Sequence, residues 1–201
     1  MIGDSITDCG RSWPVGEGIR GLGEGYVALV ANELAAACPD LRIRVLNMGI
    51  SGDTARDLQR RWQQDVLALK TDWLSVMIGV NDAWRQFDSP FNTECQVYLD
   101  EYTSILQRLI ASTLPSLSGL VLMTPFFVES DRRNPMRVKV EAYADVVRRL
   151  AREHQTVLVD TQAAFDELMV SRRPAELAWD RVHPTPAGHR ALARAFMRAL
   201  E

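Results

Sequence analysis

The sequence has 201 residues, of which 47% are hydrophobic and 24% are charged, and these values are ordinary for a globular protein. Lysine and arginine number 23 and aspartate and glutamate 26, so the net charge is −3, and we expect neither a nucleic-acid nor a membrane partner. The length fits a single domain over residues 1–201, and no apolar run approaches the roughly 18 residues of a membrane-spanning helix.

Strand and helix patterns alternate along the chain. Apolar, β-rich runs predict strands over residues 43–47, 73–78, 120–123 and 156–160. Apolar residues at helical spacing predict helices over residues 26–37, 54–69, 97–110, 137–151 and 187–200. Glycine and proline gather in loops over residues 10–25, 79–92, 124–136 and 171–186. Nearly continuous apolar strands joined by helices are typical of a parallel sheet covered on both faces, so we expect an α/β fold, a three-layer α/β/α sandwich.

The cysteines argue against a disulfide framework. Cys9, Cys38 and Cys95 are odd in number and show no paired spacing. Only Met1 and Ile2 precede the first motif, and no signal peptide is recognisable. We therefore expect a soluble protein of the reducing cytoplasm.

The first motif is Gly3-Asp4-Ser5-Ile6-Thr7-Asp8. A serine on a tight, glycine-containing turn before a helix can expose its hydroxyl as a nucleophile, and the turn aims backbone N–H groups at the same point. Taken alone, the same residues also fit an ordinary helix N-cap.

Two further segments follow predicted strands and offer hydrogen-bond donors. Gly52, in the loop that precedes the Thr54 N-cap, could present its backbone N–H to an oxyanion, although the same residues also fit a plain loop with a helix cap. Asn81, in Gly79-Val80-Asn81-Asp82, carries a side-chain amide that suits an oxyanion hole, and Asn-Asp also forms Asx turns readily.

The last motif, Asp180-Arg181-Val182-His183-Pro184, precedes the final predicted helix. An aspartate three residues before a histidine in a rigid loop can orient the imidazole as a general base. A lone histidine in such a loop can equally be a surface residue.

Together the four segments supply a nucleophile, oxyanion donors, a base and its orienting carboxylate. Their order resembles the SGNH superfamily of GDSL esterases and lipases, which implies a flavodoxin-like SGNH hydrolase fold with a central parallel sheet. The resemblance assigns Ser5, His183 and Asp180 to a catalytic triad, and Ser5, Gly52 and Asn81 to an oxyanion hole. The Gly-x-Ser-x-Gly elbow of α/β-hydrolases is absent.

Longer segments resemble a bacterial subgroup of acetylxylan esterases. They read IGDSITDCG, GYVA, IGVNDAWRQF, MTPF, VDTQAAF and AWDRVHP. The resemblance implies removal of acetyl groups from xylan or xylo-oligosaccharides, and assembly as a homo-oligomer. It also implies a strand just before the Gly-Asp-Ser turn, where only Met1 and Ile2 stand here, so we expect a truncated first strand. If the molecule begins at Met1, we expect lower stability and a poorly fixed Ser5; the alternative is a natural start upstream.

In the implied mechanism, His183 removes the Ser5 proton, Asp180 orients the imidazole, and an acyl-enzyme forms and is hydrolysed. No cluster has metal-ligand spacing, and we expect neither a metal nor a cofactor. Candidate substrate contacts are Asp4, Trp84, Phe87 and Trp179. Stacking on a sugar ring is one use for Trp84, and packing in the core or an interface is another.

Two alternative functions stay open at this stage. The same chemistry could act on another ester, as in an arylesterase, a lysophospholipase or a thioesterase. The chain could also be an inactive carbohydrate-binding module on the same scaffold.

Overall fold

The computed structural model describes residues 1–201. Its strands are β1 (Ile2–Gly3), β2 (Gly16–Glu17), β3 (Leu46–Gly49), β4 (Trp73–Met77), β5 (Gly119–Met123) and β6 (Val157–Val159). Its helices are α1 (Ser5–Asp8), α2 (Tyr26–Ala37), α3 (Ala55–Asp65), α4 (Val80–Asp88), α5 (Leu99–Thr113), α6 (Pro135–Glu153), α7 (Thr161–Met169), α8 (Pro174–Leu177) and α9 (Pro186–Ala199). None of these helices combines the length and apolar character needed to cross a membrane.

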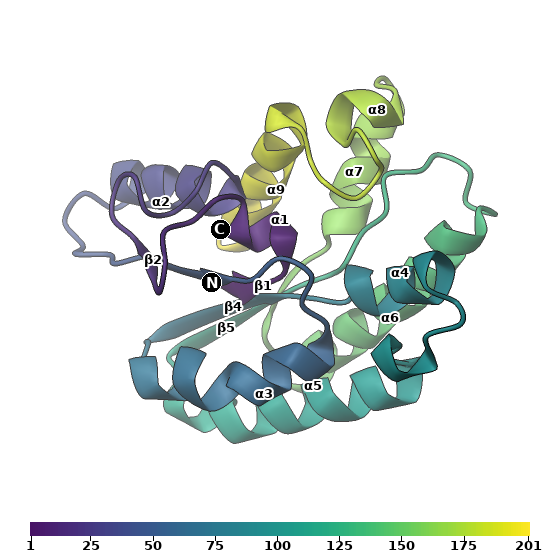
Figure 1. Cartoon of the computed structure of the whole chain (residues 1–201). Coiled ribbons are helices and arrows are strands. Elements are labelled where there is room, and N and C mark those ends of the chain that lie inside the picture. Colours follow the sequence, from purple (N-terminus) through teal and green to yellow (C-terminus); the bar gives the residue numbers. More distant parts are fainter.

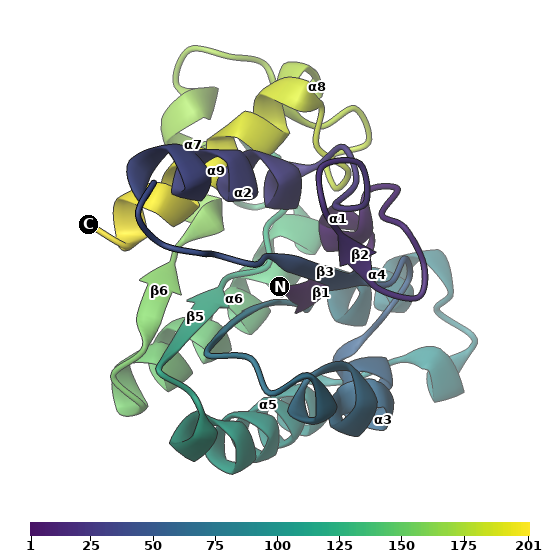
Figure 2. The same cartoon turned by 90° about the vertical axis from the view of Figure 1, so that its left-hand side faces the viewer.

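The six strands form one sheet in the order β2-β3-β1-β4-β5-β6. All neighbours are parallel except β2, a two-residue edge strand that runs antiparallel to β3. Without β2, the order is that of flavodoxin-like sheets, with helices on both faces. Figure 1 and Figure 2 show α2, α7 and α9 over one face and α3, α5 and α6 over the other. The expected three-layer α/β/α fold is confirmed, with the sheet mixed at one edge.

The first strand is short but central. Ile2 and Gly3 pair with Met48 and Gly49 on one side and with Val76 and Met77 on the other. The ladder toward β3 also includes Met1, whose carbonyl accepts from the Met48 N–H at 2.8 Å. Gly3 leaves no room for a side chain, because a Cβ there would collide with the Met77 carbonyl oxygen. The close approach of β1 to β4 fixes where the chain turns into α1.

Several predicted boundaries are wrong. The strand predicted over residues 43–47 is β3, displaced to Leu46–Gly49, because Ile43 is 42% exposed and outside the sheet. The loop predicted over residues 79–92 contains helix α4. The sequence patterns also do not predict α7 and α8, and they indicate only the start of α1 at its N-cap. By contrast, α2 has the predicted bounds, and Thr54 caps α3 through a reciprocal bond with Asp57.

Buried carboxylates fix the starts of two helices beside the carboxyl ends of β1 and β4. The Asp4 carboxylate accepts from the Ile6 N–H at 3.0 Å and caps α1. The Asp82 carboxylate accepts from the Ala55 N–H at 3.0 Å and ties α4 to the start of α3. Burial raises the pKa of Asp4 to about 7 and that of Asp82 to about 8.

Replacing Asp82 by asparagine is expected to alter how stability depends on pH. The folded-state pKa of Asp82, about 8, lies above the ordinary 3.8, so the folded chain holds a proton that the unfolded chain releases. The stability that Asp82 contributes is therefore present below about pH 4 and is lost as the pH rises toward 8, by at most about 1.4 kcal/mol per pH unit. Asparagine keeps an acceptor for Ala55 and has no proton to lose.

Urea unfolding at pH 5, 6, 7 and 8 tests this expectation. The Asp82→Asn variant should gain stability relative to the unmodified chain as the pH rises. The exposed Asp40 provides the control, as Asp40→Asn. Parallel stability curves for the chain and Asp82→Asn across this pH range would show that the buried carboxyl is not held protonated.

Candidate active site

The site lies where the carboxyl ends of β1 and β4 meet, the point at which the chain reverses its direction of travel across the sheet. In open α/β sheets, ligands bind in the crevice at such a point. Ser5 opens α1 directly after β1, and Asn81 lies in α4 directly after β4. Loop 178–184, between α8 and α9, carries Asp180 and His183 to the same place.

Three side chains form a hydrogen-bonded chain. Ser5 Oγ lies 3.0 Å from His183 Nε2, and His183 Nδ1 lies 2.6 Å from Asp180 Oδ2. The carboxylate accepts through Nδ1–H, so Nε2 is left free to accept the serine proton. Ser5 Oγ is within hydrogen-bond distance of His183, and the expectation of a poorly fixed Ser5 stays a prediction. The lower stability expected of a short first strand stays a prediction.

Hydrogen bonds stabilise the ionised form of the Asp180 carboxylate. Its Oδ1 accepts from the backbone N–H groups of Val182 at 3.0 Å and His183 at 2.7 Å. Burial by itself would raise the pKa of Asp180, but these bonds and the contact with the His183 ring outweigh burial and lower that pKa below its usual value. The carboxylate can therefore stabilise a charged imidazole beside it.

Two backbone donors near the serine are free. Neither the Ser5 N–H nor the Gly52 N–H donates a hydrogen bond within the chain. Gly52 has φ +87°, a left-handed conformation that glycine adopts without strain. An oxyanion needs unpartnered donors of this kind.

The buried Asn81 side chain supplies another donor. Its Nδ2 donates to the Asp53 carbonyl at 2.9 Å, which uses one of the two amide hydrogens and leaves the second. Gly79, which starts this segment, has φ +129°, and a Cβ there would lie 2.9 Å from the Tyr102 hydroxyl. Asn81 is helical, so the Asx turn considered from the sequence does not form.

The loop that carries Gly52 is held from several sides. Arg61, largely buried on α3, donates to the Asp53 carboxylate at 2.6 Å, to the Met48 carbonyl at 2.7 Å and to the Gly3 carbonyl at 3.1 Å. The Ile50 N–H donates to the Gly3 carbonyl at 3.0 Å. The Gly52 loop is thus bound to the ends of both β1 and β3.

The predicted substrate contacts differ in their surroundings. The Trp84 and Trp179 rings lie 6.0 and 6.2 Å from the His183 ring, and Trp179 is 72% exposed. Phe87 lies on α4 and is partly exposed, with no aromatic contact to the site. The role predicted for Asp4 is wrong, because its carboxylate is buried beneath Ser5 and caps α1.

A histidine–thiol pair, His189 with Cys9, lies at the end of α1 and lacks the features of a nucleophile. His189 Nδ1 accepts from the Tyr26 N–H at 3.1 Å, so Nε2 carries the proton that points at Cys9 Sγ, 3.4 Å away. Burial lowers the pKa of His189 to about 4 and raises the pKa of the Cys9 thiol. The thiol therefore stays protonated beside a histidine that cannot act as its base.

Sequence reasoning missed the residues that hold the site loops. Asn47 is buried, and its side chain donates to the Thr7 carbonyl at 2.7 Å and to the Leu22 carbonyl at 2.8 Å. Asn47 and Asp53 lie in the segment that carries Gly52. The one sequence signal for their role is a polar residue at the end of an apolar strand. Arg61 gave no local signal, because its partners come from three different segments.

Comparison with known proteins agrees with this arrangement. The chain is 56% identical to an acetylxylan esterase of Geobacillus stearothermophilus over 201 residues, which are 100% of this chain and 92% of that protein. A crystal structure of an acetylxylan esterase from that organism superposes with a TM-score of 0.97 at 56% identity, over 99% of this chain and 91% of the other. Further structures of that enzyme are described as catalytic mutants, with alanine in place of a serine, a histidine or an aspartate.

A more distant structure has the same fold. An α/β hydrolase from the metagenome of Lake Arreo, Spain, superposes with a TM-score of 0.95 at 48% identity, over 98% of this chain and 92% of the other. The GDSL-like lipase/acylhydrolase family matches residues 1–191. The chain therefore belongs to the GDSL-like lipase/acylhydrolase family.

Proposed function

We propose that this protein is a serine esterase that removes acetyl groups from xylan or xylo-oligosaccharides. The observation that carries the chemistry is the continuous hydrogen-bonded chain from Ser5 through His183 to Asp180. The observation that carries the substrate is 56% identity to an acetylxylan esterase along the whole chain.

In the proposed mechanism, His183 Nε2 takes the Ser5 proton as Oγ attacks the ester carbonyl carbon. Asp180 holds the imidazole orientation and stabilises its charge. The tetrahedral oxyanion accepts hydrogen bonds from the Ser5 N–H, the Gly52 N–H and the second Asn81 amide hydrogen. The alcohol leaves with the proton from His183, and water then attacks the acyl-enzyme with the same base.

The sugar would be bound beside His183. The Trp84 and Trp179 rings flank the imidazole, and Trp179 presents its ring to solvent. A flat aromatic face packs well against the apolar face of a sugar ring. Phe87 extends the partly exposed aromatic surface along α4.

We also propose one domain over residues 1–201, a homo-oligomeric assembly and a cytoplasmic location. A single sheet with one core cluster of 46 buried residues supports the domain assignment. The resemblance to the acetylxylan esterase subgroup supports the homo-oligomeric assembly. Three free cysteines suit a reducing compartment.

Replacing Ser5 by alanine is expected to abolish acetate release from acetylated xylo-oligosaccharide, because no acyl-enzyme can form without Oγ. Loss of a triad member removes most of the rate, by about 10⁴-fold or more. The Ser104→Ala variant is the matched control, because Ser104 is exposed on α5 and hydrogen-bonds only within its own helix. Release that persists in Ser5→Ala would overturn the nucleophile, and absence of release from the unmodified chain would overturn the substrate.

Replacing Trp179 by alanine is expected to raise KM for acetylated xylo-oligosaccharide by about 3- to 10-fold, a loss typical of one aromatic contact. KM for methyl acetate should stay within about twofold, since that substrate has no ring to pack against Trp179. Trp73→Ala is the control, because Trp73 is also exposed but stands at the amino end of β4. Equal effects on both substrates would argue against a sugar contact.

A further inference from the structure

The turn that carries Asp180 and His183 has one unfavourable residue at its centre. Ala178 and Pro184 form an antiparallel bridge that closes the turn. Between them, Arg181 has φ +71°, in the left-handed region. A side chain with a Cβ is disfavoured there, and glycine is the residue that adopts this conformation without steric strain.

The conformation of Arg181 matters for the site because Arg181 lies between the two triad residues Asp180 and His183. Asp180 Oδ1 accepts from the backbone N–H groups of Val182 and His183, and these bonds require the chain to fold back at Arg181. The fold-back also brings His183 Nδ1 to 2.6 Å from Asp180 Oδ2. If Arg181 relaxed to an extended conformation, the carboxylate and the imidazole would separate.

Two contacts from loop 124–134 hold Arg181 in place. The Val128 N–H donates to the Arg181 carbonyl at 2.8 Å. The Glu129 carboxylate forms an ion pair with the Arg181 guanidinium through Oε2, and its Oε1 accepts from the Asp131 N–H at 3.0 Å. The Glu129 side chain is 10% exposed, whereas that of Arg181 is 48% exposed, so the carboxylate is the fixed partner and the arginine reaches to it.

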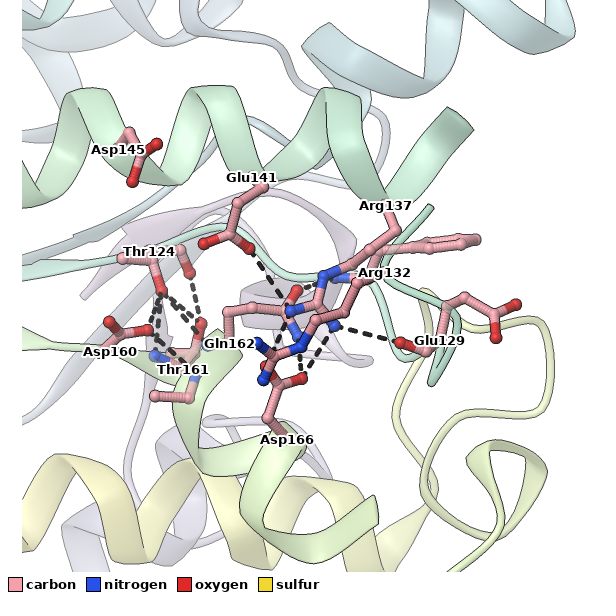
Figure 3. A network of polar contacts seen from close by, with 12 residues as sticks. Thr124, Glu129, Arg132, Arg137, Glu141, Asp145, Asp160, Thr161, Gln162 and Asp166 are labelled. Atoms are coloured by element: carbon pink, nitrogen blue, oxygen red, sulfur yellow. Dashed lines mark hydrogen bonds and ion pairs between the residues drawn. The ribbon is translucent and has the colours of Figure 1, made fainter. Parts of the chain in front are cut away.

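Glu129 is itself anchored to the helices. Arg137, buried on α6, donates to the Glu129 carbonyl at 3.1 Å and forms a two-pronged pair with Asp166 of α7 at 2.8 Å (Figure 3). Gln162 of α7 accepts from the Phe127 N–H at 2.8 Å. The loop that contacts Arg181 is therefore bound by side chains of α6 and α7, two helices that take no part in the reaction.

We propose that Glu129 is a positioning residue, whose buried carboxylate holds Arg181 in its left-handed conformation and thereby aligns Asp180 with His183. The inference rests on the proposed esterase mechanism and adds to it a residue that touches neither substrate nor reacting atoms. A pair of this kind acts on the geometry of catalysis and not on substrate binding, so its loss should lower kcat and leave KM in place.

The test compares Glu129→Gln with a double variant that also carries Arg181→Gly. Glutamine keeps the size and the acceptor for the Asp131 N–H but removes the charge that holds Arg181. We expect kcat on an aryl acetate to fall by about 10-fold, with KM within about twofold, as for a displaced catalytic pair. Glycine adopts the left-handed conformation unaided, so Glu129→Gln/Arg181→Gly should recover kcat to within about threefold of the unmodified chain.

The outcomes separate a positioning role from a merely structural one. A role limited to loop stability would leave the double variant as slow as Glu129→Gln, and that result would overturn the proposal, as would a kcat of Glu129→Gln equal to that of the unmodified chain. If Glu129→Gln does not fold, the double variant decides, because the proposal requires it to fold and turn over. Asp131→Asn is the matched control in the same loop, since Asp131 pairs with the exposed Arg133.

Failure of the inference is distinguishable from failure of the proposed function. If the unmodified chain hydrolyses the aryl acetate and Ser5→Ala does not, the esterase mechanism stands whatever the Glu129 variants do. If neither the chain nor any variant hydrolyses an ester, the mechanism itself is wrong.

Discussion

The hydrogen bond between Ser5 and His183 is the contact on which the site depends, and it joins residues 178 positions apart. Neither residue can reach the other by local folding. Ser5 is placed by the central strand β1, and His183 by the loop between α8 and α9. Helix α9 packs beside α2 over the same face of the sheet (Figure 2), and the loop that precedes α9 carries His183 to the carboxyl end of β1.

The same edge of the sheet carries several buried polar groups. Asn47, Asp4, Asp82 and Asn81 are all less than 5% exposed. Asn47, Asp82 and Asn81 each bind the backbone of a neighbouring segment, and Asp4 caps α1. These bonds hold loops that a wholly apolar core could not orient. Their cost is the burial of carboxyl groups, and the raised pKa values of Asp4 and Asp82 express that cost.

The sequence predicts the secondary structure correctly where the hydrophobic periodicity is strong. The prediction fails where tertiary contacts override local preferences. Helix α2 follows from its apolar spacing. Helix α4 did not, because Asn81 and Asp82 favour turns in isolation. In the folded chain the Asn81 amide binds the Asp53 carbonyl and the Asp82 carboxylate binds the Ala55 N–H, so neither side chain competes with its own helix.

The triad geometry agrees with the sequence motifs because each motif is short and directly follows a strand or precedes a helix. Glu129 could not be found in this way, since its partner Arg181 is 52 positions away and nothing in the neighbouring residues marks the pair. Contacts that orient a site are long-range, whereas the groups that perform the chemistry are set by local turns. Sequence motifs therefore indicate the reacting residues, whereas the residues that orient them are found only in the folded structure.

Covalent labelling with a fluorophosphonate, followed by mass spectrometry of the digested chain, tests whether the Asp180–His183 pair activates Ser5. We expect a single adduct on the peptide of residues 1–11, in which Ser5 is the one serine, and a labelling rate lower by about 100-fold or more in His183→Ala. An adduct on another residue, or equal labelling without His183, would contradict this expectation.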